Sequence, residues 1–559
     1  MLFRDQFHSR HTPIRIIHVG AGAAGILTTA YKAQKLLKNF EIVCYEKNSG
    51  VGGTWFENRY PGCACDIPAH SYTFSFNPNP EWSGYYVGAE EIHSYMEKFC
   101  QKNNLTRFIR LNTTVLGAEW DDITGEWVVE LKGPDGEHFT DRANVIVNGS
   151  GPLNKWKWLA FPNRRNFKGK ICHTTAWDPT IDWMNKRVAV IGCGASGVQV
   201  APQLAKVIDF FARNIQWITP PLGLQDIRVP GVEDDSGTQA PGSLGTHRYT
   251  EAEKRAMRED PASFLSYRKT ADQILQRWFG VFIRDSPVQQ EAVRLMTMSI
   301  REQFGGDHKE LAEKFIPDFG PGCKRNTPAE GFIEAIIQDN ITVVQDDMAS
   351  FTETGLVTAT GHTFEFDIIA CATGFDVAYT PHYPVKGLEG KTMKDQWAEA
   401  CRPRIYLTVA TPGFPNFFHI GGPTGNWGSG CVLSSHEVQA DYAIQACLKL
   451  SSENLHSGEG CKSWYKNGGT ADGEVMLWCG SMLHMMKTLK SPRWEDHEIR
   501  RRDGDLNREG NMWAFLGGPG NTELEAAAAK GMNVDLSPFV RSDDYPWDVE
   551  LTSNIVASV

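Results

Sequence analysis

The chain has 559 residues, which is too long for a single hydrophobic core, and its 41% hydrophobic and 22% charged residues are ordinary globular values. The formal net charge of −11 argues against a nucleic-acid partner and against an anionic membrane surface. Residues 1–15 hold no apolar core of signal-peptide length, and no segment has about 18 uninterrupted apolar residues. We therefore expect a cytoplasmic enzyme of two or three domains.

A glycine-rich turn follows the first apolar run of the chain, residues 15–19. The turn reads Gly20-Ala21-Gly22-Ala23-Ala24-Gly25, and apolar residues recur at helical spacing over 26–37. A second apolar run, 40–45, ends at Glu46, about 20 residues past the last glycine, where dinucleotide-binding folds place the acid that binds a ribose hydroxyl. This order predicts a site for a nucleotide with a free 2′-hydroxyl, such as FAD.

The same order recurs near the middle of the chain. The run 187–191 leads into Gly192-Cys193-Gly194-Ala195-Ser196-Gly197, residues 198–207 have helical spacing, and the run 209–212 ends at Arg213. A cation in place of the acid attracts a 2′-phosphate, so the second site favours NADPH. The alternative is that Arg213 is a solvated surface residue.

Other segments complete the predicted organisation. The apolar runs 145–147 and 367–372 end in small-residue turns, and 220–321 is rich in helix formers, including 250–258 and 287–304. We predict an α/β fold with two Rossmann-like dinucleotide-binding domains and a helical insertion in the NADPH domain. The expected boundaries are 1–152 and 379–559 for the FAD domain with a C-terminal extension, 160–222 and 322–378 for the NADPH domain, and 223–321 for the insertion.

The thirteen cysteines contain no Cys-x-x-Cys pair and favour buried, reduced thiols. Cys63 and Cys65 are the only close pair. They do not have the Cys-x4-Cys spacing of a flavin disulfide redox pair, and no further metal ligands stand near them in the sequence. No metal site is therefore expected.

Two longer motifs identify a family. The first runs from Gly52 to Asp66 and matches [Ala/Gly]-Gly-x-Trp-x4-[Phe/Tyr]-Pro-[Gly/Met]-x3-Asp, and the second runs from Phe167 to Asp178 and matches Phe-x-Gly-x3-His-x3-Trp-[Pro/Asp]. With these motifs the chain resembles type I Baeyer–Villiger monooxygenases. Two departures from the family average, residues 422–428 and a tail from about 494 to 559, resemble fungal members. The ending Trp177-Asp178 favours this branch over the related N- or S-oxygenating flavin monooxygenases.

The resemblance implies an FAD-dependent, NADPH-consuming enzyme that converts ketones to esters or lactones through a flavin peroxide. Its partners would be a small-molecule ketone and dioxygen, and its expected assembly is a monomer or a weak homo-oligomer. Alternatives are an N- or S-oxygenating flavin monooxygenase and a nucleotide-binding redox sensor without catalysis. A ketone-dependent oxidation of NADPH would eliminate the sensor.

The resemblance also assigns roles to residues. Arg325 would lie over the flavin and stabilise developing negative charge, and Asp66 would orient it. His173 would have a conformational role between the nucleotide domains, and Asn426 and Trp427 would line the substrate pocket. The expected cofactor-binding residues are Gly20, Gly22, Ala23, Gly25, Glu46, Lys47, Gly53, Thr54, Trp55, Asp66, Ile67, Tyr72, Val115, Gly192, Gly194, Ala195, Ser196, Gly197, Arg213, Lys324 and Trp464.

Overall fold

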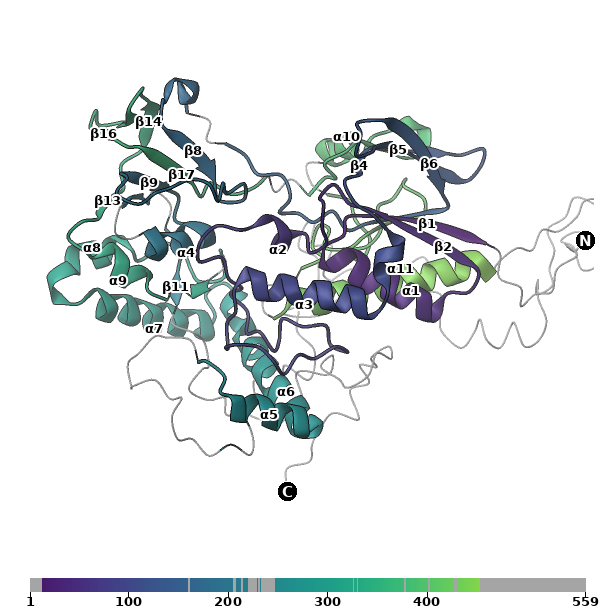
Figure 1. The fold of residues 1–559 in the computed structure, drawn as a ribbon, viewed down its shortest axis with the longest axis horizontal. Helices are drawn as coiled ribbons and strands as arrows, with labels where there is room; N and C mark the ends of the chain where they lie inside the picture. The colour runs from purple at the N-terminus through teal and green to yellow at the C-terminus, as the bar shows by residue number, and fades with distance from the viewer. Residues whose placement is uncertain are drawn as a thin grey trace, which may run out of the picture.

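Two parallel five-stranded sheets organise the protein, which confirms the α/β class (Figure 1). The computed structural model describes residues 13–158, 161–204, 208–212, 215–219, 229, 232, 247–324, 326–328, 330–376, 379–400, 403–426 and 430–452. In Figure 1 the sheet built around β9 lies on the left and the sheet built around β1 lies on the right. The short helix α2 (Thr54–Glu57) lies between them in this view.

The first sheet has the strand order β19-β7-β1-β2-β3, and all its pairs are parallel. The strands are β1 (Ile14–Val19), β2 (Phe40–Tyr45), β3 (Ile109–Arg110), β7 (Val145–Asn148) and β19 (Phe417–His419). Successive side chains of β1 point to opposite faces, and both faces are covered, so four of its six residues are apolar, the others being Arg15 and the buried His18. Ile16 packs into one hydrophobic cluster and Ile17 into another.

Helices cover one face of this sheet and a second sheet covers the other. The helices are η1 (Ala23–Ala30, a π-helix), α1 (Tyr31–Leu36), α3 (Ala89–Lys102) and α11 (Val432–Ser452). The covering sheet has the order β18-β4-β5-β6, made of β18 (Val385–Lys386), β4 (Thr114–Asp121), β5 (Glu126–Lys132) and β6 (His138–Ala143). Trp127, Val129 and Leu131 of β5 pack toward the first sheet.

The second parallel sheet is built in the same way. Its order is β13-β10-β9-β17-β8, with β8 (Lys170–His173), β9 (Val188–Ile191), β10 (Ile208–Phe211), β13 (Thr342–Val344) and β17 (Ile368–Cys371). Helices α4 (Ala195–Leu204) and α9 (Phe332–Ile336) pack on one face. The antiparallel strands β14 (Met348–Phe351), β15 (Gly355–Thr358) and β16 (Thr363–Glu365) cover the other.

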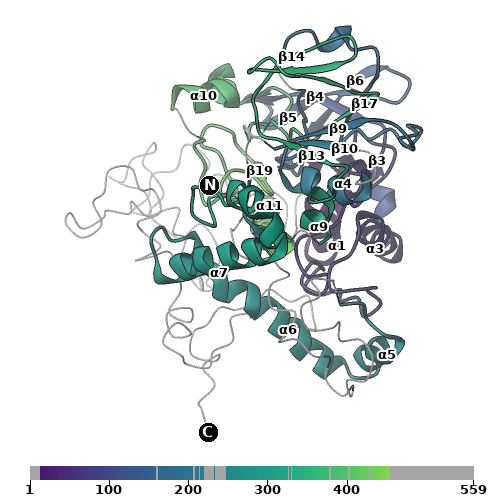
Figure 2. The same cartoon turned by 90° about the vertical axis from the view of Figure 1, so that its left-hand side faces the viewer.

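The segment between β11 (Ile218–Thr219) and β12 (Thr327–Pro328) is mainly helical among the residues that the structure describes. It contains α5 (Glu251–Glu259), α6 (Pro261–Arg277), α7 (Pro287–Phe304) and α8 (Lys309–Lys314), so the helices expected at 250–258 and 287–304 are confirmed. Both views place α5 and α6 far from the β4–β6 sheet (Figure 2). Buried residues of α6 join the core of the first sheet, whereas those of α7 and α8 join the core of the second.

The remaining elements are short. They are the α-helix α10 (Met393–Glu399) and the 3-10 helices η2 (Leu105–Phe108), η3 (Arg164–Asn166), η5 (Trp278–Phe282), η6 (Gly306–His308) and η7 (Leu388–Gly390). Within the described residues no helix is long and apolar enough to cross a membrane. Eight of the ten described cysteines are buried.

Two predicted helices begin three residues earlier than their apolar spacing indicated. The helix expected over 26–37 begins at Ala23, and the helix expected over 198–207 begins at Ala195. Periodicity detects only positions that face a core, whereas the first helical turn here is made by the small residues of the glycine turn. The last three residues of each glycine turn therefore begin the helix that follows.

Candidate functional site

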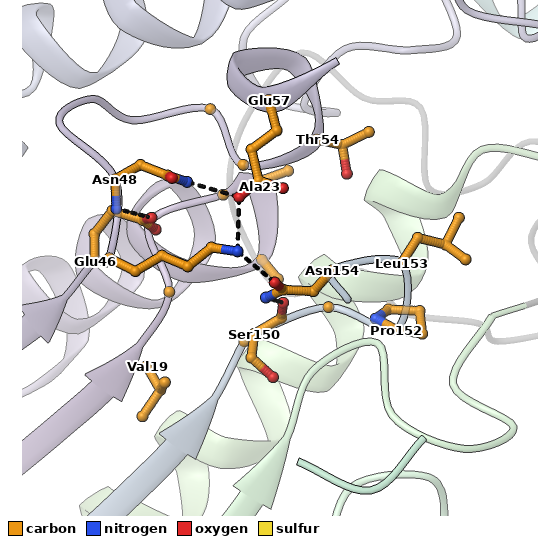
Figure 3. Close-up of a pocket in the computed structure, with 18 of the residues that line it drawn as sticks. Val19, Ala23, Glu46, Asn48, Thr54, Glu57, Ser150, Pro152, Leu153 and Asn154 are labelled. Atoms are coloured by element: carbon orange, nitrogen blue, oxygen red, sulfur yellow. Dashed lines mark hydrogen bonds and ion pairs between the residues drawn. The ribbon is translucent and has the colours of Figure 1, made fainter. Parts of the chain in front are cut away.

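A cavity of about 390 Å³ opens where β1, β2 and β7 end (Figure 3). Its wall includes Val19 at the end of β1, Gly20 after it, Glu46 after β2 and Ser150 after β7. In open parallel sheets, ligands bind outside the carboxyl ends of the strands, and this cavity has that position. Of the predicted residues, those that line it are Gly20, Gly22, Ala23, Glu46, Lys47, Gly53, Thr54, Trp55, Tyr72, Val115 and Asn426.

The first and last glycines of the first turn are packed too tightly to carry a side chain. Gly20 has φ +94°, and a Cβ there would meet the carbonyl oxygen of Gly149 at 2.8 Å. A Cβ on Gly25 would meet the carbonyl oxygen of Gly20 at 1.9 Å, and one on Gly53 would meet the Cα of Gly22 at 2.9 Å. Bare backbone therefore faces the cavity, the arrangement in which a pyrophosphate can approach amide groups at a helix N-terminus.

Glu46 is held in the cavity wall by backbone donors. Its carboxylate accepts from the amide of Ala21 at 2.6 Å and from the amide of Asn48 at 2.8 Å, and the residue is only 4% exposed. Burial raises the pKa of Glu46, and the two amide hydrogen bonds act in the opposite direction. Its position fixes an acceptor where the sequence predicts a ribose hydroxyl.

Polar side chains from three segments meet beside Glu46 (Figure 3). The Lys47 ammonium lies 2.8 Å from Glu57 Oε1 and donates to Asn154 Oδ1 at 2.5 Å, and Asn48 Nδ2 donates to Glu57 Oε1 at 2.9 Å. Only Lys47 was predicted. Asn48 and Asn154 follow the ends of β2 and β7, so the strand-end rule could have found them.

The first motif contributes an aromatic pair to the same cavity. The indole Nε1 of Trp55 donates to the hydroxyl of Tyr72 at 3.1 Å, and the two rings meet edge to face at 5.5 Å and 84°. The hydrogen bond to Tyr72 gives the indole N–H of Trp55 a partner at the wall of a cavity that is mostly apolar.

Some predicted residues do not line this cavity. Gly25 packs against Gly20, and Ile67 is buried in the core of the first sheet. Asp66 is half-buried, and its charge contributes to raising the pKa values of Tyr60 and Tyr72, so it lies near both.

The second glycine turn repeats the geometry of the first. Gly192 has φ +113°, and a Cβ there would meet the carbonyl oxygen of Ala372 at 2.4 Å, while one on Gly197 would meet the carbonyl oxygen of Gly192 at 1.9 Å. A Cβ on the central Gly194 would meet nothing within 4 Å. The turn therefore leaves its central glycine open. Ala195 begins α4, and Ser196 Oγ accepts from Thr174 Oγ1 at 3.2 Å.

Lys324 lies near this second turn. Burial raises the pKa of the Cys193 thiol to about 12, and the Lys324 charge opposes that shift, so the ammonium is within electrostatic reach of the turn. Residues 327–328 of β12, shortly after Lys324 in the chain, pair with 218–219 of β11, which follows β10. The Lys324 Nζ is 4.8 Å from the centroid of the Phe319 ring.

Four predicted residues lie outside the described residues. They are Arg213, Arg325, Trp427 and Trp464.

His173, at the end of β8, packs on the segment that connects the two parallel sheets. Its ring stacks on Trp156 at 4.8 Å and 20° and meets Trp158 edge to face at 6.1 Å. Nδ1 accepts from the amide of Thr175 at 3.2 Å, and burial lowers the pKa of His173 to about 4. A neutral, buried ring of this kind suits packing better than proton transfer.

A parallel α/β fold with two such turns is typical of redox enzymes that use dinucleotides. Residues 14–219 match a family described as flavin-binding monooxygenase-like. Among curated relatives, the FAD-binding monooxygenase moxY of Dothistroma septosporum is 36% identical over 90% of this chain and 82% of its own length. A Baeyer–Villiger monooxygenase of Pseudomonas aeruginosa is 31% identical over 82% of this chain and 86% of its own length.

Solved structures have the same fold. A steroid monooxygenase bound to NADP is 26% identical with a TM-score of 0.63, covering 79% of this chain and 87% of that one. The open structure of cyclohexanone monooxygenase is 24% identical with a TM-score of 0.65, covering 79% and 89%. The chain belongs to the family of flavin-dependent monooxygenases that includes the Baeyer–Villiger monooxygenases.

Proposed function

We propose that the protein is an FAD- and NADPH-dependent Baeyer–Villiger monooxygenase that converts ketones to esters or lactones. The observation that carries the proposal is the first motif, matched at every fixed position from Gly52 to Asp66, with Gly53, Thr54 and Trp55 in the wall of the cavity at the first glycine turn. Relatives named as Baeyer–Villiger monooxygenases support it.

The first cavity suits FAD. A Cβ on Gly20 or Gly25 in the turn, or on Gly53 beside it, would collide with neighbouring atoms. The bare backbone can therefore admit a pyrophosphate to its amides, and Glu46 can accept from a ribose hydroxyl. Gly53 and Trp55 would then face the isoalloxazine ring. We accordingly assign 1–152 and the chain from 379 onward to the FAD domain.

The second turn suits NADPH. Gly194 is open to a ligand, and Lys324 supplies positive charge beside the turn. Arg213, at the end of the second Rossmann pattern, would bind the 2′-phosphate. We assign 160–222 and 322–378 to the NADPH domain, with 223–321 as its helical insertion.

The bound flavin, once reduced by NADPH, supplies the reaction with dioxygen that delivers one oxygen atom to the ketone. Arg325 would stabilise the negative charge that develops on the reacting oxygens. Asp66, half-buried and near Tyr60 and Tyr72, would hold the guanidinium in place and offset the cost of burying it.

The test uses purified protein and a panel of linear, cyclic and aryl ketones, with an amine and a sulfide as competing substrates. We expect denatured protein to release FAD, NADPH to bleach the flavin without oxygen, and ketones to gain one oxygen atom that derives from labelled dioxygen. Products oxygenated only on nitrogen or sulfur would identify the alternative enzyme class. Absence of FAD after reconstitution would refute the proposal.

A further inference from the structure

The first motif contacts both parallel sheets. Its beginning, Gly53 to Trp55, lines the cavity of the first sheet. Further along, Tyr60 is 8% exposed and belongs to the hydrophobic core of the second sheet, and Cys63 packs against that core. The middle of the motif is therefore anchored in the second unit, whereas its beginning and Cys65, near its end, pack in the core of the first.

Gly62 brings this segment against the backbone of α4. It has φ +78°, and a Cβ there would meet the carbonyl oxygen of Gln199 at 2.4 Å. A side chain here would be strained at that φ and, with the backbone as it lies in this chain, would collide with the helix, so this chain has glycine at the motif's Gly/Met position. The contact fixes the distance between the motif and the helix that begins at the second glycine turn.

The side chain of Gln199 holds the segment at two points. Its Oε1 accepts from the hydroxyl of Tyr60 at 2.7 Å, and its Nε2 donates to the carbonyl oxygen of Ala64 at 3.0 Å. Burial raises the pKa of Tyr60 far above its ordinary range, so the phenol remains a donor at any working pH. We call Tyr60, Gly62, Ala64 and Gln199 the motif clamp.

The clamp joins two functional positions along the chain. Gln199 follows the last glycine of the second turn, Gly197, by two residues, and Ala64 precedes Asp66 by two residues. An amide that bonds both ends of the 60–64 segment sets the direction in which the chain enters Asp66. The amide of Cys65 then donates to the carbonyl oxygen of Val87 at 3.1 Å and its side chain packs in the core of the first sheet, so Asp66 follows the point where the chain passes from one sheet to the other.

We propose that Gln199 is a positioning residue for oxygen transfer: through the motif clamp it makes the placement of Asp66 depend on the sheet that carries the second nucleotide turn. This inference rests on the proposed function, because it assigns Asp66 a part in that reaction. It assigns Tyr60 to Gly62, in the middle of the motif, a role in coupling the two sheets that is separate from contact with the flavin.

The experiment compares Gln199→Met with Gln203→Met, the same change one turn further along α4. The Gln203 side chain is exposed, and its Cγ lies beside Gly62, but the two clamp hydrogen bonds are made by Gln199, so the control keeps the packing contact and leaves both bonds in place. We expect both variants to retain FAD and to be reduced by NADPH at a rate within about twofold of wild type. In Gln199→Met alone, the ratio of ester to hydrogen peroxide should fall by about tenfold, as two lost neutral hydrogen bonds would produce. Tyr60→Phe, which removes one of the two bonds, should lie between them.

A double-mutant cycle tests whether Gln199 acts through Asp66. Adding Gln199→Met to Asp66→Ala should cause no further loss of the product ratio, because the residue that the clamp positions is already absent. Independent, additive losses would overturn the proposal. Equal ratios for Gln199→Met and Gln203→Met would overturn it as well.

Hydrogen exchange supplies a readout that needs no turnover. The amides of residues 63–66 should exchange faster in Gln199→Met than in Gln203→Met, with and without saturating NADP⁺. If the wild-type protein oxygenates no ketone but the two variants still differ in exchange, the proposed function fails while the clamp stands. Unchanged exchange in Gln199→Met refutes the clamp in an otherwise active enzyme.

Discussion

Alanine at Gly25 and alanine at Gly197 should disable one nucleotide site each. In both turns the new Cβ would lie 1.9 Å from the carbonyl oxygen of the turn's first glycine. Contacts under 3.0 Å essentially never occur for a Cβ, so the helix or the turn must move by about 1.1 Å, and the atom in the way is backbone rather than a flexible side chain. The two variants are therefore the same steric experiment on different sites.

The magnitude follows from the displaced amides. A shift of about 1 Å takes an N–H beyond good hydrogen-bond distance from a phosphate oxygen, and each charge-assisted bond lost costs about 1.5–3 kcal/mol, or roughly 10–150-fold in dissociation constant. The overpacked helix adds a stability cost of about 1–3 kcal/mol. Gly306→Ala is the matched control, because Gly306 is exposed and a Cβ there meets nothing within 4 Å.

The assay measures FAD content by absorbance and NADP⁺ affinity by titration. Gly25→Ala should be isolated without flavin and should regain it only at high FAD concentration. Gly197→Ala should remain yellow yet fail to be reduced by NADPH, while dithionite still reduces it. A Gly197→Ala protein that loses FAD and keeps its affinity for NADP⁺ would refute the assignment of the two turns.

Three further changes test individual side chains. Arg213→Ala should lower kcat/KM for NADPH relative to kcat/KM for NADH, by an amount equivalent to about 1.5–3 kcal/mol. Equal losses for both cofactors would rule out a 2′-phosphate contact. Arg325→Ala should retain FAD but form ester about 10²–10³-fold more slowly, and the NADPH that it consumes should yield hydrogen peroxide. Adding Asp66→Ala should reduce ester formation little further. Ester formation near the wild-type rate in Arg325→Ala would place the catalytic cation elsewhere. Burial, with the charge of Arg268, lowers the pKa of His70 to about 3, so between pH 6.5 and 3 only the unfolded chain takes up a proton there and stability falls as the pH falls. In acid-unfolding titrations His70→Phe should remove about 1.4 kcal/mol per pH unit of that loss, and an unchanged slope would contradict the assignment.

The nucleotide turns could be predicted from the sequence because local rules fix them. A buried parallel strand reads as a continuous apolar run, and the residue at its end must turn sharply with positive φ, which favours glycine. Gly20 and Gly192 both have this conformation. The place of the first cavity then follows, since ligands of such sheets bind at the carboxyl ends of the strands.

The rest depends on contacts between distant segments. Glu57 reaches Lys47 and Asn48 only because α2 folds back over the end of β2, and no local pattern records that approach. The pairing of β11 with β12, which places Lys324 near the second turn, involves two residues on each strand and is too short for periodicity. The packing of α6 into the core of the first sheet likewise depends on tertiary contacts that no local sequence pattern predicts.

The fixed spacing of the first motif has a physical origin in the two sheets. Gly53 must pass the backbone of Gly22 at the first turn, and Gly62 must pass the backbone of Gln199 on the helix after the second turn. With the backbone as it lies in this chain, a Cβ at either glycine would collide with the other segment, and the two contacts are anchored in different units. The number of residues between them is therefore set by the distance from the cavity to α4, and an insertion would displace one of the two contacts. A sequence pattern of this length thus encodes how two nucleotide-binding sheets are joined, as well as what surrounds one ligand.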